Sequence, residues 1–333
     1  MKKLLLLFLI LLSGCSSNFN ETASEEIGIN IFREDENLIV NFVPTEKTSI
    51  KEITDGDFSH AAIISETGEV NLIDFDFYID KEKSIFTADG EKKIENITGI
   101  YLTNKYNSIT DAYYDMEEYL KNDEKVMTVL LDGFSYNQYK NAHEKDYIPF
   151  LSKYFKYPAL SVLTPVTNAG FAAIITGQTP DVNGVHDRSV RQMNVDSIFE
   201  YALNNNKNSI LLESDIKILN TEIEPELHID QNKNGDTDDE MFESALRASK
   251  ENFDLIFIHF HGIDDRGHSF GPYSEETMGY IKKLDEYLET LSEIWDGHII
   301  LVSDHGMHET SEGGGHGMCY QSDMVVPYFI KEK

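Results

Sequence analysis

Two short segments near the C-terminal end of the sequence carry carboxylate and imidazole side chains that suit a transition-metal site. Their candidate ligands are Asp264, His268, Asp304, His305 and His316. Asp264 and His268 follow the apolar run 253–260, and Asp304 and His305 follow the apolar run 298–302. His316 lies further on, in a glycine-rich turn. In an α/β sheet, ligands bind at the loops that follow the strands. Mixed carboxylate and imidazole ligands suit Zn²⁺, with Mn²⁺ or Fe as alternatives. These residues therefore predict most of a site for two divalent metals.

Two segments upstream supply one more carboxylate and a hydroxyl group. The apolar run 127–131 predicts a buried strand that ends at Asp132, with Gly133 for a tight turn. Residues 164–177 predict a strand exit and then a helix of small and apolar residues that begins at Thr167. The N–H groups and the dipole at a helix N-terminus favour an anion. Because a nearby metal also lowers the pKa of a hydroxyl group, we predict Thr167 as the nucleophile.

In this order and spacing, the four segments resemble the alkaline phosphatase superfamily. The resemblance is closest to its type I phosphodiesterase/nucleotide pyrophosphatase branch and to the related phosphonoacetate hydrolases, and it extends over roughly residues 125–333. It implies an alkaline-phosphatase-like fold with two bound metals. For one metal it implies the ligands Asp264, His268 and His316. For the other metal it implies the ligands Asp132, Thr167, Asp304 and His305.

The segment at the nucleophile departs from the nucleotide pyrophosphatase pattern. Gly170 stands where that pattern has Asn, and the pair Thr167-Asn168 is closer to the phosphonoacetate hydrolase pattern. We expect Asn168 to donate a hydrogen bond to a phosphoryl oxygen. Arg188 is a second candidate contact to phosphate, with a surface salt bridge as the alternative. The substrate class therefore stays open between phosphate esters and phosphonates.

Two histidines, His259 and His261, precede the Asp264 segment. Alternation along the preceding strand predicts that one of them packs in the interior and the other lines the cleft. A metal contact is the alternative for each.

The chemistry that these residues predict is phosphoryl transfer. Two cations about 4 Å apart can bridge the attacking and leaving oxygens of an in-line displacement at phosphorus. Thr167 would attack phosphorus to give a phospho-threonine intermediate, which water then hydrolyses. The predicted function is an exported metal-dependent phosphodiesterase or nucleotide pyrophosphatase that acts on small phosphate esters. The alternatives are a phosphomonoesterase or phosphonate hydrolase with the same nucleophile and metals, and a non-catalytic metal-binding surface lipoprotein.

A separate acidic loop resembles an EF-hand calcium loop. Its candidate ligands are Asp230, Asn232, Asn234, Asp236 and Asp238. Oxygen ligands at alternating positions with a glycine at the bend are typical of that loop. Met241 stands where the closing glutamate is expected, so a polar solvent loop is the alternative. Calcium bound here would be structural.

The N-terminal residues predict an exported lipoprotein. Lys2 and Lys3 precede an apolar run, residues 4–12, that is too short to span a bilayer. Residues 12–15 resemble a bacterial lipobox that ends at Cys15. We therefore predict a signal peptide over residues 1–14, a lipid on Cys15, a tether over residues 15–25, and an extracytoplasmic location on the bacterial cell membrane.

The sequence predicts two folded parts. Residues 26–106 show short strand-like runs separated by turns, which predict a small β-rich domain. A helical linker is expected over 107–125. Strands and helices alternate over 126–333, which predicts an α/β catalytic domain with a mainly parallel sheet and helices on both faces. The net charge of −31 and the lack of a basic patch argue against binding to a nucleic acid duplex. The oligomeric state stays open.

Overall fold

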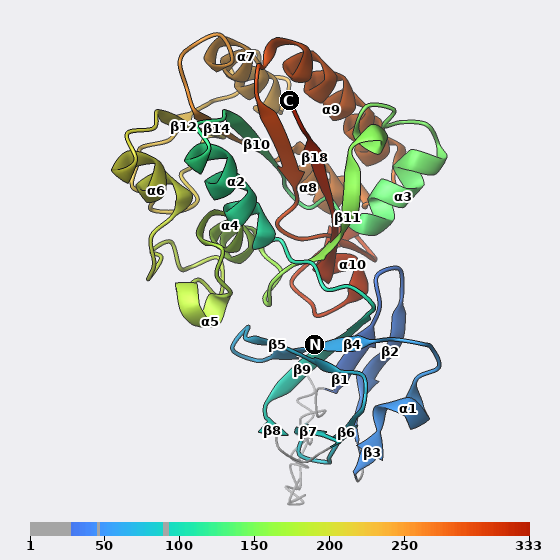
Figure 1. Cartoon of the computed structure of the whole chain (residues 1–333). Coiled ribbons are helices and arrows are strands. Elements are labelled where there is room, and N and C mark those ends of the chain that lie inside the picture. The colour runs from blue at the N-terminus through green and yellow to red at the C-terminus, as the bar shows by residue number, and fades with distance from the viewer. Residues whose placement is uncertain (1–27, 45–46, 89–92) are drawn as a thin grey trace, which may run out of the picture.

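The computed structural model describes residues 28–44, 47–88 and 93–333. The predicted signal peptide, the tether and Cys15 therefore lie outside the described residues. The described chain has a larger part built around one sheet and a smaller β-rich part beside it (Figure 1).

The central sheet of the larger part has seven strands in the order β11-β18-β15-β10-β14-β12-β13. In chain order these strands are β10 (Val126–Leu131), β11 (Phe155–Leu160), β12 (Ser209–Glu213), β13 (Glu226–Leu227), β14 (Leu255–Phe260), β15 (His298–Val302) and β18 (Val325–Lys331). The five strands from β15 to β13 are parallel, and β18 pairs antiparallel with both β15 and β11. This confirms the predicted α/β class and its mainly parallel sheet.

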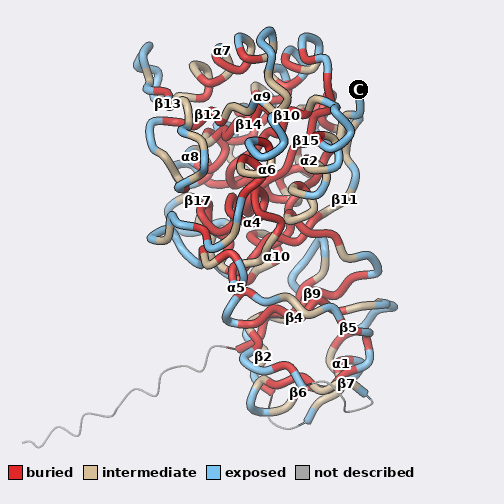
Figure 2. The backbone as a smooth tube through the Cα atoms, turned by 60° about the vertical axis from the view of Figure 1, so that its left-hand side comes forward, coloured by how far each residue is buried: buried red, intermediate tan, exposed pale blue. Residues whose placement is uncertain are grey.

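Helices cover both faces of this sheet (Figure 1). On one face lie α2 (Asp111–Lys121), α4 (Thr167–Thr176) and α6 (Ile198–Asn204), and on the other lie α3 (Tyr136–Glu144), α7 (Asp238–Ala248) and α9 (Glu275–Ile294). The apolar stripe of α9, which includes Ile281, Leu284 and Leu288, is buried against the sheet. In Figure 2 the buried residues gather in the interior of the larger part, around the strands.

Several helices differ from the sequence prediction. The expected linker is helical, but α2 buries Ala112, Met116 and Leu120 in the same hydrophobic cluster as α4. It is therefore part of one helical layer rather than a linker. Two longer helices were not predicted: α3, which follows β10, and α8 (Gly262–Phe270), which follows β14. The shorter elements of this part are α5 (Pro180–Asn183), α10 (Gln321–Met324) and the hairpin of β16 (His308–Thr310) and β17 (Gly313–Gly315).

The smaller part contains two sheets. The first has the order β2-β1-β9-β4-β5 and the second the order β3-β6-β7-β8. These elements are β1 (Ile29–Phe32), β2 (Asn37–Phe42), β3 (Thr48–Ser49), α1 (Ile50–Ile53), β4 (His60–Ser65), β5 (Val70–Asp74), β6 (Phe77–Ile79), β7 (Ile85–Thr87), β8 (Lys93–Ile94) and β9 (Ile97–Thr103).

The two parts share a hydrophobic cluster. Its members from the smaller part are Phe32, Ala62, Ile64 and Tyr101, and its members from the larger part are Leu160, Leu163, Cys319, Met324 and Val325. The Gln321 side chain also donates to the Glu34 carbonyl oxygen at 2.7 Å. The smaller part therefore packs directly against the larger part, at the segment before Thr167 and the segment after His316.

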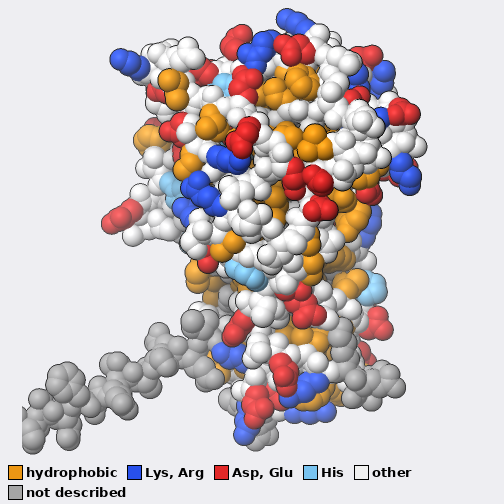
Figure 3. Space-filling model, turned by 90° about the vertical axis from the view of Figure 1, so that its left-hand side faces the viewer, with side chains coloured by type: hydrophobic (Ala, Val, Ile, Leu, Met, Phe, Trp, Pro, Cys, Tyr) orange, Lys and Arg blue, Asp and Glu red, His pale blue; other side chains and the backbone are white. Residues whose placement is uncertain are grey.

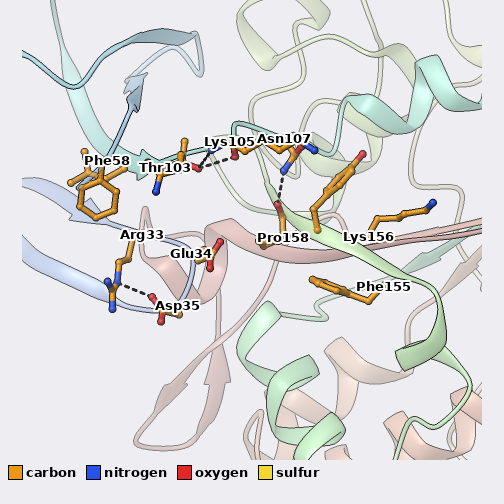
Figure 4. Close-up of a pocket in the computed structure, with 13 residues that line it drawn as sticks. Arg33, Glu34, Asp35, Phe58, Thr103, Lys105, Asn107, Phe155, Lys156 and Pro158 are labelled. Atoms are coloured by element: carbon orange, nitrogen blue, oxygen red, sulfur yellow. Dashed lines mark hydrogen bonds and ion pairs between the residues drawn. The ribbon is translucent and has the colours of Figure 1, made fainter. Parts of the chain in front are cut away.

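A cavity lies at the joint between the two parts. It has a volume of about 450 Å³ and is lined by Arg33, Lys105, Phe155 and Lys156 among others (Figure 4). None of the predicted metal ligands lines it. On the face seen in Figure 3, acidic and basic side chains are interspersed. Among the described residues, no helix has both the length and the apolar character needed to cross a membrane.

Candidate metal and active site

The site lies where three adjacent strands of the central sheet end. β10 is paired in parallel with β14 on one side and with β15 on the other. Asp132 directly follows β10, and the pair Asp304-His305 follows β15. Because parallel strands end at the same edge of a sheet, these side chains meet there. The third strand, β14, leads into α8 and the Asp264 segment.

Helix α8 explains the spacing between Asp264 and His268. Residues four apart lie on the same helix face, and the Oδ2 atom of Asp264 is 3.4 Å from Nε2 of His268. The N-terminus of α8 is held by the buried Asp238, whose carboxylate accepts from the N–H groups of His261 at 3.0 Å and Gly262 at 2.9 Å. Asp238 therefore fixes the helix that carries two predicted ligands.

The structure brings the predicted metal ligands into two overlapping groups. In one group the ligand atoms of Asp132, Asp304 and His305 lie within 4.8 Å of one another, and in the other those of Asp264, His305 and His316 do. The Nε2 atom of His305 is 3.3 Å from Oδ1 of Asp132 and 3.4 Å from Oδ2 of Asp304. His268 joins the second group through its contact with Asp264.

Thr167 is the first residue of α4 and points toward these ligands. Its Oγ1 atom lies 3.4 Å from Nε2 of His305. The helix approaches Asp304 closely, because a Cβ atom at Gly170 would lie 2.4 Å from the Asp304 carbonyl oxygen. Only glycine fits this approach without a shift. The departure from the pyrophosphatase pattern at Gly170 is thus a packing requirement here, and it brings the N-terminus of α4 to the metal ligands.

The geometry fits bound cations. Oxygens of three buried carboxylates, Asp132 Oδ1, Asp264 Oδ1 and Asp304 Oδ2, have no hydrogen-bond partner. Buried polar atoms are normally paired, so a cluster of unpaired carboxylate oxygens suits a bound cation. The donor set of carboxylates and imidazoles suits Zn²⁺ or Mn²⁺.

The electrostatics of the site also suit a bound cation. Burial raises the pKa of Asp304 well above its usual value, and the nearby charge of Asp132 raises it further. Burial also acts on Asp132, but the neighbouring imidazoles hold its pKa well below the usual value. Burial and the neighbouring His305 lower the pKa of His316 to about 4, which keeps its imidazole neutral, as metal binding requires. A divalent cation would relieve the repulsion between the carboxylates.

The two predicted phosphate contacts differ from each other in the structure. Asn168 is buried, and its amide nitrogen donates to the carbonyl oxygens of Val190 at 3.1 Å and Ile218 at 3.4 Å. Both N–H groups of its side-chain amide are therefore engaged, and we revise the role of this side chain to holding the loop around Val190 against α4. Arg188, by contrast, lies with a guanidinium nitrogen against Nε2 of His316, at the metal ligands.

The predicted calcium ligands serve other partners. Asp236 forms an ion pair with Arg266 at 3.0 Å, and Asp238 binds the start of α8. Asp230 accepts from backbone N–H groups within its own loop, at Asn234 and Gly235. Asp236 and Asp238 thus bind groups outside the loop, whereas Asp230 and Asn232 both accept from the Asn234 N–H group within it. Calcium binding stays a prediction.

Sequence reasoning missed Glu213 and gave no firm role to His259 and His261. His259 is fully buried, 3.4 Å from Asp132, and His261 lies 3.1 Å from the same Asp132 carboxylate oxygen. Glu213 is the last residue of β12 and lies 3.5 Å from the other side of His259. The sequence feature that could have identified Glu213 is its position as a carboxylate at the end of a predicted strand.

Comparisons with known proteins give short segments of similarity. Over 93 residues, 26% of this chain, the sequence is 33% identical to GPI ethanolamine phosphate transferase 1 of Neurospora crassa. Over 82 residues, 22% of this chain, it is 34% identical to the same transferase of Mus musculus. The matched segments span only 9% and 8% of those proteins, so the chain spans about a tenth of the length of the curated relatives it matches.

Two solved structures are similar to parts of the fold. Phosphonoacetate hydrolase from Sinorhizobium meliloti 1021 has a TM-score of 0.45 and 16% identity, covering 56% of this chain and 57% of that chain. Murine ectonucleotide pyrophosphatase / phosphodiesterase 5 has a TM-score of 0.47 and 16% identity, covering 57% of this chain and 59% of that chain. In sequence, residues 217–326, which contain five of the predicted metal ligands, match the type I phosphodiesterase / nucleotide pyrophosphatase family.

Proposed function

We propose that this chain is a metal-dependent phosphodiesterase or nucleotide pyrophosphatase that holds two divalent metals, most favourably Zn²⁺. The observation that carries the proposal is the meeting of the Thr167 hydroxyl with two overlapping groups of carboxylates and imidazoles at one edge of the sheet. The family match over residues 217–326 supports the same chemistry.

In this proposal Asp132, Asp304 and His305 hold one cation and Asp264, His268 and His316 hold the other. When bound, the cations would polarise the phosphoryl oxygens and lower the pKa of the threonine hydroxyl.

The chain's own part begins at Thr167. Its Oγ atom loses a proton and bonds to phosphorus, while the ester P–O bond breaks and the alcohol leaves with a proton. Water then attacks phosphorus, which restores the hydroxyl and frees a phosphate monoester. The N-terminus of α4 favours the anion formed during both steps.

Arg188 is the proposed phosphate contact. Its guanidinium lies against Nε2 of His316, the atom that we assign to a metal, so an occupied site would leave the guanidinium free for a phosphoryl oxygen. Arginine suits this role because its planar fork pairs with two phosphate oxygens.

A second candidate is group transfer to an alcohol. The curated relatives are named as ethanolamine phosphate transferases, and an alcohol that replaced water in the second step would give transfer instead of hydrolysis. The alternative of a phosphomonoesterase or phosphonate hydrolase uses the same residues.

We also propose that the protein is exported and lipid-anchored through Cys15. The support is the basic and apolar N-terminal pattern that ends in Leu12-Ser13-Gly14-Cys15. Intact mass analysis of protein from membranes of an expressing bacterium tests this, since a diacylglyceryl adduct is expected in the wild type and absent in Cys15→Ala. Wild-type protein that keeps residues 1–14 and carries no lipid would contradict it.

Hydrolysis assays test the catalytic proposal. Turnover of bis-p-nitrophenyl phosphate is expected to stop with EDTA and return with Zn²⁺ or Mn²⁺, and Asp304→Asn is expected to stay inactive under both conditions. The exposed Asp296→Asn serves as the matched control. Parallel assays with p-nitrophenyl phosphate, phosphonoacetate and added ethanolamine distinguish the diesterase from the alternatives. Diester turnover that survives EDTA and Asp304→Asn would contradict the metal-dependent mechanism.

A further inference from the structure

The two carboxylate oxygens of Asp132 face in different directions. Oδ1 faces His305 at 3.3 Å, within the site already described. Oδ2 faces two other imidazoles, with Nε2 of His259 at 3.4 Å and Nδ1 of His261 at 3.1 Å. The ligand atoms of Asp132, His259 and His261 all lie within 4.8 Å of one another. Asp132 therefore joins a third group of potential metal ligands that the two-metal mechanism does not use.

His259, in this third group, is the member that is both buried and unpaired. His259 is fully buried, and neither of its ring nitrogens has a hydrogen-bond partner. Nε2 of His261 also lacks a partner. Buried polar atoms without partners are rare in folded proteins and need an explanation. A cation that accepts the lone pair of His259 Nε2 supplies one.

We propose that Asp132 Oδ2, His259 Nε2 and His261 Nδ1 bind a third divalent transition metal. Tetrahedral zinc with bonds of about 2.0–2.1 Å places neighbouring ligand atoms about 3.3 Å apart, close to the 3.1 Å and 3.4 Å found here. Two imidazoles and one carboxylate match the ligand preference of Zn²⁺, whereas Mg²⁺ and Ca²⁺ prefer oxygen ligands alone. The inference rests on the proposed function, because Asp132 bridges this ion to the metal that it shares with His305.

Glu213 completes the arrangement from behind. Its side chain is fully buried, and Oε1 lies 3.5 Å from Nδ1 of His259. Metal-binding histidines commonly donate their second ring N–H group to a carboxylate, which fixes the tautomer and aims the other nitrogen at the metal. Glu213 occupies that position, at the end of β12, and is therefore a positioning residue rather than a ligand.

Zinc stoichiometry tests the third site without any measurement of turnover. The full-length chain is stripped with chelator, loaded with Zn²⁺, separated from free metal and subjected to elemental analysis. We expect about three zinc ions per chain in the wild type and about two in His261→Ala. His316→Ala is expected to lose a different ion, so the double variant should retain about one. The exposed His143→Ala is the matched control and keeps the wild-type content.

A second variant guards against misfolding. Glu213→Gln preserves the shape of the side chain. We expect it to lower the affinity for one zinc ion by about 10- to 100-fold and to leave the affinity for the other two unchanged. Saturation of the wild type at two zinc ions, with no loss in His261→Ala, would overturn the third site even if hydrolysis is observed. Three zinc ions without hydrolysis that depends on Thr167 would instead overturn the proposed function and leave the third site standing.

Discussion

Replacing Gly170 with alanine tests whether α4 must lie directly against Asp304. The new Cβ atom would lie 2.4 Å from the Asp304 carbonyl oxygen, whereas ordinary contact begins at 3.4 Å. The helix must therefore shift by about 1 Å, and a misplacement of that size can lower a catalytic rate roughly 100-fold. Overpacking costs about 1–3 kcal/mol of stability, and the better helix propensity of alanine offsets about 1 kcal/mol of that. We expect a folded protein whose kcat for bis-p-nitrophenyl phosphate falls about 100-fold.

Gly279→Ala is the matched control for this experiment. Gly279 lies in the exposed face of α9 with nothing within 4 Å of the added Cβ atom. We expect an unchanged kcat and a gain of about 0.5–1 kcal/mol in the free energy of unfolding, measured with urea. If Gly170→Ala keeps the wild-type kcat, the packing of α4 on Asp304 does not position the nucleophile.

Three further changes probe separate parts of the site. Arg188→Ala should raise KM for the diester about tenfold, because one hydrogen bond to a charged group contributes about 1.5 kcal/mol; steady-state kinetics measures this. Asp238→Asn should lower the free energy of unfolding by about 1.5–3 kcal/mol, since the buried carboxylate accepts from the Gly262 N–H group; urea unfolding measures this. Asp323 raises the pKa of His308 in the folded protein. The stabilisation from this ion pair is therefore complete below the pKa of the unfolded state, about 6.5, and it is lost as the pH rises through the higher pKa of the folded state. His308→Asn should remove this pH-dependent part of the unfolding free energy, measured in EDTA from about pH 6 to 9.

Each of these has a clear contrary result. A kcat that falls while KM stays constant in Arg188→Ala would place the guanidinium in the chemical step instead of in substrate binding. A wild-type urea midpoint for Asp238→Asn would show that α8 does not depend on this carboxylate. Equal pH dependence in His308→Asn and the wild type would remove the pairing as its cause.

The ligand residues were predictable because strand ends are readable in the sequence. Buried parallel strands appear as apolar runs. Asp132 directly follows one such run, and Asp304 follows another with only Ser303 between. Helix α8 was not predictable in the same way. It contains Gly262 and Gly267, which disfavour helix, and its start is held by the distant Asp238. A tertiary hydrogen bond between residues far apart in sequence leaves no local pattern.

The partners of polar side chains were the part that sequence did not reveal. Asn168 has the residue type for a phosphate contact, yet its N–H groups bind the carbonyl oxygens of Val190 and Ile218. Asp236 has the spacing of a calcium ligand, yet it pairs with Arg266. Residue type limits what a side chain can bind, whereas the packing of loops from elsewhere in the chain decides which partner it meets.

The central claim is nucleophilic attack by Thr167, and trapping the covalent intermediate tests it most directly. The zinc-loaded protein is mixed with bis-p-nitrophenyl phosphate, quenched with acid and digested for peptide mass spectrometry, beside Thr167→Ala and the same-helix control Thr176→Ala. We predict a phosphoryl adduct on Thr167 in the wild type and the control, with kcat at least about 1,000-fold lower in Thr167→Ala, in line with the removal of other catalytic nucleophiles. Wild-type turnover in Thr167→Ala, or an adduct on another residue, would contradict the mechanism.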